Sequence, residues 1–434
     1  MKEHFLIDNI FFINMIISRV VKSKLFSNIF NQFLLYGFSH ILPFLLMPYL
    51  LATIGVAKYG LVNFAIAFAF YFQVFQEWGF DLSNVRHVVK YKNDQKQLSL
   101  TFFSILSCKF CLAIASFIVY LSIVYFVPEF RKNDSLYLLA FVRLLGILIS
   151  PYWLFRSMED VKYVTRVSLI VKCISILPIF VVVRKPEDFT WVMFFFALET
   201  VLSGILALGI AINKYKLLWV RVSFNDVVYY FKDSFPFFTS MFLTRVYQTS
   251  NTFILGVVCG DFVTGIYSAA EKLHNVYTSL ITPLIEDIFY PYFSRIKDIV
   301  KINMMVLSII ALNLFIIIII YFISPYIIPL FIKAEQDEIM FAFNLFLLLL
   351  VVRVPNDILG FPYLGVLGKI KEVRNSTVVA TTVYSLGIVL FLISGIVSIS
   401  NIIYLLLATN LVSVLCRIKH IFKHFRSKKE ISLS

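Results

Sequence analysis

The stretch GIYSAAEKLHNVYTSLITPLIEDIFYPYFSR, residues 265–295, decides how this chain folds. Most of it is apolar, and it is long enough to cross a bilayer whose hydrocarbon core is about 30 Å thick. Glu271 and Lys272 nevertheless stand side by side inside it. At about 1.5 Å per residue, Lys272 lies about 12 Å from the start of the span near Thr264, close to mid-depth. A charge there costs about 2.5–3.5 kcal/mol against lipid, so it must face other helices or water.

The polar residues of this segment form one stripe. At 100° per residue they fall within about 120° of one another: Thr264, Ser268, Glu271, Lys272, Asn275, Thr278, Ser279, Thr282 and Glu286. Residues 234–259 carry a second stripe that includes Arg245, Gln248 and Asn251. A stripe that runs the length of a span lines either a polar helix interface or an aqueous cavity, and both interpretations stay open.

The whole chain has the composition of a membrane protein. Of its 434 residues, 60% are hydrophobic and 15% charged, and apolar runs of about twenty residues recur from end to end. This composition excludes a soluble domain and predicts an all-α integral membrane protein with about twelve spans. The expected spans are 29–54, 59–80, 100–127, 135–155, 164–183, 191–212, 234–259, 263–290, 303–323, 339–359, 376–398 and 401–416.

The basic residues predict the orientation in the membrane. The formal net charge is +14, but the Lys and Arg residues fall between apolar runs rather than along one soluble face, which argues against nucleic acid as a partner. The segments on one side of the predicted membrane carry 27 of the 39 Lys and Arg residues, and those on the other carry 6. By the positive-inside rule the first side, which holds both termini, is cytoplasmic.

The longest inner loop, 213–233, falls near the midpoint and leaves six predicted spans on each side. We therefore expect an N-terminal segment 1–28, a six-helix lobe 29–212, a connector 213–233, a second lobe 234–416 and a basic tail 417–434. Two such halves are typical of transporters that rock around a central site. No cleavable signal peptide is expected near Met1, and a start at Met1 or at Met15 fits equally well.

Four deep cations make a binding site for an anionic group the main hypothesis. Arg143, Lys172, Arg245 and Lys272 lie in four different spans of both halves, whereas one structural ion pair, such as Arg245 with Glu271, would not require four. Polar candidates for lining the same cavity are Gln248, Asn251, Ser268, Asn275 and Thr278.

Other intramembrane charges have two interpretations each. Glu271 and Glu199 are candidates for proton or sodium coupling, although a hydrogen bond between packed helices is the more expected role of Glu199. Lys109 and Arg353 lie nearer the cytoplasmic ends of their spans, where long side chains can reach the headgroups. No metal site and no cofactor are expected.

Several stretches carry a resemblance to a known family: IGVAKYGLVNFA (54–65), WGFDLSNVRHV (78–88), PYWLFRSMEDVKYVT (151–165) and, above all, residues 265–295. The chain resembles bacterial oligosaccharide flippases of the O-antigen and capsule type, in the polysaccharide transporter branch of the multidrug and oligosaccharidyl-lipid exporter superfamily. Arg156 and Ser157 depart from the Gln-Gly often found there.

The resemblance implies a MATE-like fold of two lobes around a cationic cavity. It also implies alternating access in the bacterial inner membrane. The substrate would be an undecaprenyl-pyrophosphate-linked oligosaccharide, moved from the cytoplasmic to the outer leaflet. Glycosyltransferases and a polymerase of the same pathway would be its partners. No pattern in the sequence specifies which sugars the substrate carries.

Two alternatives remain. One is a drug or cation antiporter of the same superfamily, for which deep carboxylates should outnumber deep cations. The other is a membrane glycan polymerase or glycosyltransferase, which needs substantial outer loops and, in many transferases, acidic residues that hold a metal. The expected outer loops here are short.

Overall fold

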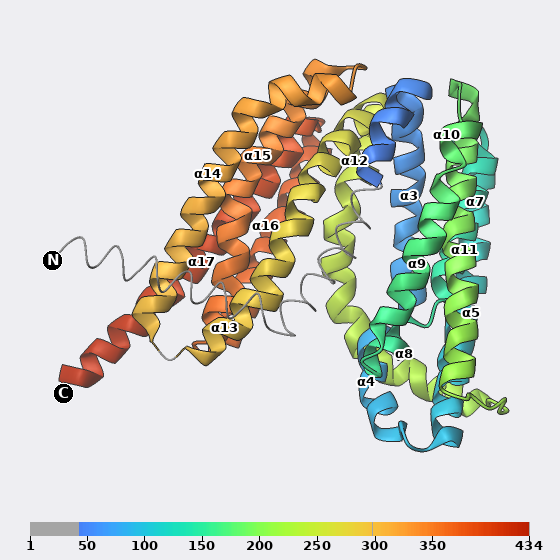
Figure 1. The fold of residues 1–434 in the computed structure, drawn as a ribbon, viewed down its shortest axis with the longest axis horizontal. Coiled ribbons are helices and arrows are strands. Elements are labelled where there is room, and N and C mark those ends of the chain that lie inside the picture. The colour runs from blue at the N-terminus through green and yellow to red at the C-terminus, as the bar shows by residue number, and fades with distance from the viewer. Residues whose placement is uncertain (1–42, 297, 434) are drawn as a thin grey trace.

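The computed structural model describes residues 43–296 and 298–433, and every regular element in these residues is a helix (Figure 1). The predicted N-terminal segment 1–28 and residues 29–42 of the first predicted span lie outside the described residues. The first helix described is Pro43–Thr53.

The helices that follow up to the middle of the chain form one group around α7 and α11. Their bounds are α3 Gly55–Glu77, α4 Phe80–Tyr91, α5 Gln95–Phe126, α6 Pro128–Arg131, α7 Asp134–Ile149, α8 Tyr152–Ser157, α9 Val161–Ile176, α10 Ile179–Val182, the 3₁₀ turn η1 Pro186–Asp188 and α11 Phe189–Lys214.

The second part of the chain begins with the long helix α12. The bounds are α12 Phe224–Pro283, the π-helical turn η2 Leu284–Phe289, α13 Tyr290–Arg295, α14 Ile299–Phe331, α15 Gln336–Ile358, the π-helical turn η3 Leu359–Gly365, α16 Ile370–Ser394 and α17 Ile399–Leu433. In Figure 1, α14–α17 lie on one side, α5–α11 lie on the other, and α3 and α12 lie between them.

Ten helices in the described residues are long and apolar enough to cross a membrane. Two predicted spans are not counted separately, for different reasons. The span 29–54 is described only from residue 43, and the span 234–259 is part of α12. Gly260 interrupts α12 with a left-handed φ of 84°, so the helix has two arms that correspond to the spans 234–259 and 263–290. The connector 213–233 is shorter than predicted, because α12 already begins at Phe224.

The first arm of α12 packs against the first group of helices. The ring of Phe238 stacks on Trp78 with centroids 4.3 Å apart, and the hydroxyls of Ser234 and Ser83 lie 2.6 Å apart. Arg86 and His87 of α4 both contact Asp233. The division into two six-helix lobes at residue 233 stays a prediction, and these contacts tie the start of the second predicted lobe to α3 and α4.

Near Gly260 the helices α3 and α12 touch backbone to backbone. A Cβ atom added to Gly60 would overlap the carbonyl oxygen of Asp261, and one added to Gly265 would overlap the carbonyl oxygen of Val56. Only glycine permits this approach, since every other residue carries the Cβ atom that would clash. The contact closes the end of the molecule that the charge bias predicts to be outer.

The apolar core is continuous at that end and divided at the other. One cluster joins residues of both parts of the chain, among them Tyr59, Phe68, Tyr267 and Phe346. Toward the predicted cytoplasmic end a second cluster draws on α4, α5, α8, α9, α11 and the start of α12, whereas a third draws on α13–α15, η2, η3 and α17. Apart from the start of α12, which joins the second cluster, the two parts therefore share a core at one end only.

We predict that Gly60→Ala lowers the free energy of unfolding by about 1–3 kcal/mol, because the added methyl group forces α3 away from α12. The matched control is Gly209→Ala on α11, where an added Cβ atom meets nothing within 4 Å. That change should be neutral or stabilise the helix by up to about 1 kcal/mol. Thermal unfolding of the detergent-solubilised protein checks both, and equal effects of the two substitutions would contradict the role of the contact.

Candidate functional site

A central cavity of about 660 Å³ lies where the second arm of α12 faces helices of the first group. Most of the polar stripe predicted from the sequence lines it: Ser268, Glu271, Lys272, Asn275, Thr278, Ser279 and Thr282. From the first group come Asn63 on α3 and Lys172 on α9. Of the two interpretations of the stripe, the structure favours an open polar space.

Two of the four predicted cations line this cavity, and a third lies near it. Lys172 and Lys272 both line it, one from each part of the chain. Lys172 and Arg143 act electrostatically on Lys272 as like charges, which places Arg143 of α7 close to the same region. Lys272 forms no salt bridge among the described residues; the charge that Glu271 brings beside it is its main electrostatic counterpart. The positive side chains thus crowd together beside open space.

Arg245 has a different position from the one predicted. It forms an ion pair with Glu77 of α3, and both side chains are largely buried. It does not line the central cavity. The alternative of a structural ion pair holds for Arg245, but its partner is Glu77 and not Glu271. The reason is that the first arm of α12 leans on α3, so its polar face meets the end of α3 that carries Glu77. Gln73 donates a hydrogen bond of 2.8 Å to the same Glu77 carboxylate.

The remaining predicted lining residues are divided between two cavities. The side chain of Gln248 lies outside the described part of the chain. Asn251 is buried, accepts a hydrogen bond of 2.5 Å from Tyr384, and lines a second cavity of about 480 Å³ among α12, α15, α16 and α17. Glu271 and Asn275 border both this cavity and the central one. Glu271 therefore stands in the wall between two polar spaces, and Tyr267 donates to it over 3.4 Å.

Arg353 and Lys109 are the two charges for which the sequence left open whether they lie inside the bundle or reach the headgroups. Arg353 lies 3.0 Å from the His274 ring inside the helix group, rather than reaching toward the membrane surface. Lys109 is also internal, only 4% exposed, with its ammonium 3.9 Å from Asp81. The interfacial interpretation of both side chains is wrong, because polar partners exist inside the bundle.

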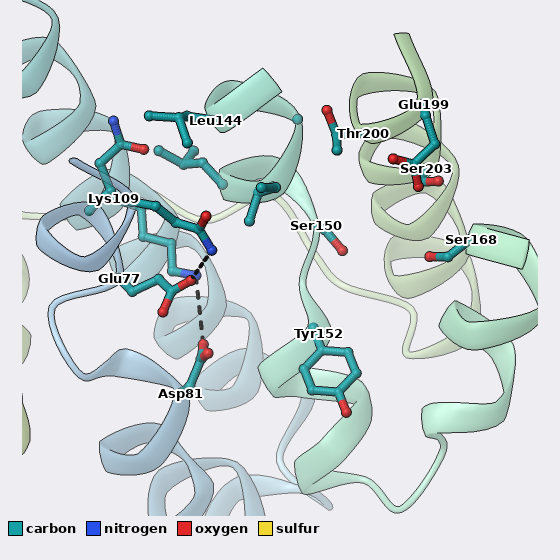
Figure 2. Close-up of a pocket in the computed structure, with 15 residues that line it drawn as sticks. Glu77, Asp81, Lys109, Leu144, Ser150, Tyr152, Ser168, Glu199, Thr200 and Ser203 are labelled. Atoms are coloured by element: carbon teal, nitrogen blue, oxygen red, sulfur yellow. Dashed lines mark hydrogen bonds and ion pairs between the residues drawn. The ribbon is translucent and has the colours of Figure 1, made fainter. Parts of the chain in front are cut away.

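Glu199 lines a third cavity, of about 260 Å³, within the first group of helices. It interacts electrostatically with Lys172 and Arg143, and its role in ion coupling or in helix packing stays a prediction. Figure 2 shows Glu77, Asp81 and Lys109 on one side of this cavity and Thr200 and Ser203 on the other. Sequence reasoning missed Gln76 and Ser203 here. Gln73, Gln76 and Glu77 at helical spacing on α3 were the available signal.

The described residues contain no group of three or more His, Cys, Asp or Glu side chains that could hold a metal ion. The chemistry that these cavities offer is therefore recognition by ammonium and guanidinium groups, carboxylates, amides and hydroxyls.

Comparison with known proteins decides the family. The profile of the family described as polysaccharide biosynthesis protein matches residues 25–297, well over half of the chain. The chain belongs to the polysaccharide biosynthesis protein family. One relative, named "Putative O-antigen transporter", from Escherichia coli (strain K12), is 28% identical over 289 residues, which are 65% of this chain and 69% of the relative. Another of the same name, from Shigella dysenteriae, is 24% identical over 279 residues, or 62% and 70%.

Solved structures show the fold of this family member. A multidrug resistance MATE family transporter in an inward-facing conformation superposes with a TM-score of 0.63 at 12% identity, covering 88% of this chain and 95% of that one. The lipid II flippase MurJ in an inward closed conformation gives 0.62 at 15% identity, covering 92% and 87%. The fold is MATE-like, as predicted, and the chain is a multi-pass membrane transporter rather than an enzyme.

The position of Arg245 leads to a double-mutant prediction. Arg245→Gln or Glu77→Gln alone should destabilise the protein by about 3–5 kcal/mol, because each leaves one largely buried charge without its partner. The double substitution should cost clearly less than the sum, since neither charge then remains. Thermal unfolding of the four proteins measures the coupling. Additive effects, together with lost transport in Arg245→Gln alone, would restore Arg245 to the substrate site.

Proposed function

We propose that this family member is a flippase that moves an undecaprenyl-pyrophosphate-linked oligosaccharide from the cytoplasmic to the outer leaflet of the bacterial inner membrane. The observation that supports it best is that Lys172 and Lys272, one from each part of the chain, line one cavity, with Arg143 near enough to act electrostatically on Lys272. The names of the relatives point to the same class of substrate.

The chemistry of such a substrate requires this arrangement. A diphosphate cannot enter hydrocarbon without groups that replace its hydration, and ammonium and guanidinium groups do so with strong, charge-assisted hydrogen bonds. The cations also need the ligand, because like charges held close together repel one another in a medium of low dielectric constant. An anionic headgroup between Lys172 and Lys272 relieves that repulsion and joins the two parts of the chain.

The divided core supports an inward-facing state. Backbone contact at Gly60 and Gly265 closes one end, and separate apolar clusters leave the other end apart. The bias of Lys and Arg assigns the open end, and both termini, to the cytoplasm. The lipid-linked substrate is made in that leaflet, so this is the state that receives it. Two six-helix lobes that rock about the closed end would then deliver it outward.

Two carboxylates are the candidates for coupling of transport to protons or sodium ions. Glu271 borders the central and the second cavity, and Glu199 interacts with Lys172 and Arg143. Each would compensate the cations while the site is empty, and each would change its interactions once phosphates arrive. A drug or cation antiporter is the nearest alternative, but the central cavity presents more ammonium groups than a cationic substrate would tolerate.

We predict that Lys272→Ala, at normal abundance, abolishes surface polysaccharide and causes complete lipid-linked units to accumulate on the cytoplasmic leaflet. Immunoblots of surface glycan and extraction of lipid-linked intermediates measure these effects. The matched control is Lys333→Ala, since Lys333 is exposed and lines none of the three cavities. Full surface display in Lys272→Ala would remove this residue from the mechanism. Assembled units that reach the outer leaflet but stay unpolymerised would favour an enzyme.

A second prediction concerns the side from which the cavity is reached. Thr278 lines the central cavity and is partly exposed, so Thr278→Cys should react with a membrane-impermeant maleimide several-fold faster in inverted vesicles than in intact cells. Lys333→Cys, in a predicted outer loop, should show the opposite preference. The native cysteines are first replaced by serine or alanine. Faster labelling of Thr278→Cys from outside would contradict the inward-facing assignment.

A further inference from the structure

The cavity of about 260 Å³ within the first group of helices has a different chemistry from the central one. Its walls come from α3, α4, α5, α7, α9 and α11, with Tyr152 of α8 at one side (Figure 2). We call it the side cavity. Helices α7 and α11 are locked together beside it, because Gly146 and Gly204 let the two backbones touch, and Thr200 donates a hydrogen bond of 3.1 Å to the carbonyl of Arg143. The walls are therefore rigid.

Two buried polar groups in this wall lack partners. Gln76 is 3% exposed and Ser203 is 7% exposed, and both line the side cavity. The Gln76 amide nitrogen and the Ser203 hydroxyl form no hydrogen bond among the described residues. A buried polar group left without a partner costs about 1–3 kcal/mol, so two such groups facing one polar space indicate that a ligand satisfies them.

The charges define the class of ligand. Glu77, Asp81 and Glu199 line the side cavity and Lys109 is its single cation, so a diphosphate would meet net repulsion there. A metal cation or sodium ion is disfavoured for the opposite reason, because the ammonium of Lys109 already lies 3.9 Å from Asp81. An uncharged ligand rich in hydroxyl groups suits a set of carboxylates, an amide and serine hydroxyls, which can both accept and donate hydrogen bonds.

We propose that the side cavity binds a sugar ring of the lipid-linked oligosaccharide while the central cations hold its diphosphate. This rests on the proposed flippase function and adds a subsite for the glycan. The volume suits one ring rather than a whole chain, since pockets for drug-sized ligands begin at about 300 Å³. Glu199 connects the two sites, because it lines the side cavity and interacts electrostatically with Lys172 and Arg143.

The test compares two lipids on the purified full-length protein in nanodiscs. One is undecaprenyl diphosphate, and the other is the lipid-linked oligosaccharide extracted from membranes of cells that lack this chain. Gln76→Leu and Ser203→Ala should together weaken binding of the oligosaccharide lipid about 10-fold, the effect of losing two hydrogen bonds. Binding of undecaprenyl diphosphate should change less than twofold. Lys272→Ala should weaken both lipids alike.

The matched control is Ser116→Ala on α5. Ser116 is 2% exposed, and its hydroxyl also lacks a hydrogen-bond partner in the described residues, but it does not line the side cavity. It should affect neither lipid. Ser203→Ala alone removes one oxygen atom and keeps the test valid if Gln76→Leu does not fold, with about a threefold loss expected for the oligosaccharide lipid.

Three results would overturn the sugar subsite. Equal losses for both lipids in Gln76→Leu/Ser203→Ala would show a general structural defect, and unchanged binding of both would show that the side cavity takes no part. A change only in the sodium or pH dependence of binding would assign the cavity to a cation or proton. Failure of the unaltered protein to bind either lipid would overturn the flippase function itself, and is distinct from the other three.

Discussion

The backbone contact between α3 and α12 at Gly60 and Gly265 is the constraint on which the rest of the structure depends. It brings two helices from different parts of the chain closer than any side chain would allow, and so fixes one end of the molecule shut. The shared apolar cluster continues from this contact. Because the apolar cores separate away from this contact, the polar faces of α9 and α12 are held apart rather than sealed together. The central cavity is therefore a consequence of closure elsewhere.

The cations that border this cavity carry an energetic cost that explains their neighbours. Burial and mutual repulsion both disfavour Lys172 beside Lys272, and neither lipid nor apolar packing can offset that. Glu271 and Glu199 supply negative charge close to these cations. The positive groups thus remain directed at open space. A ligand with concentrated negative charge interacts favourably with cations of both parts of the chain at once. Its binding can therefore change the distance between the two parts.

Hydropathy and loop charge were sufficient to predict the class of fold, because the bilayer forces each span to be apolar and helical. Helical phase placed Lys272, Ser268, Asn275 and Thr278 on the face that lines the cavity. Phase could not name the partner of Arg245, since it gives the direction of a side chain but not which helix stands opposite; Glu77 lies 168 residues earlier. The side cavity escaped for a similar reason: Gln76 and Ser203 lie on separate helices, and phase does not show that these two helices face one another. The two spans that hydropathy separated are the two arms of α12, which meet at the break at Gly260.

The polar interior is divided by sign of charge, and that division fits an amphiphilic headgroup better than it fits a small ion. The central cavity has two ammonium groups and one carboxylate in its lining, and the side cavity has three carboxylates and one ammonium group; the first group of helices contributes to both. If either cavity bound a single ion, we would expect the positive and negative side chains around it to pair directly with one another and close the space. Instead Glu199 stands between them, near enough to Lys172 and Arg143 to lower their repulsion while its own helix forms the wall of the side cavity. A diphosphate and the first sugar attached to it have this order of charge along one molecule, negative and then neutral. A carboxylate at the boundary would repel the phosphates from the side cavity and accept hydrogen bonds from the sugar hydroxyls. It would thereby fix the position of the headgroup along the two cavities.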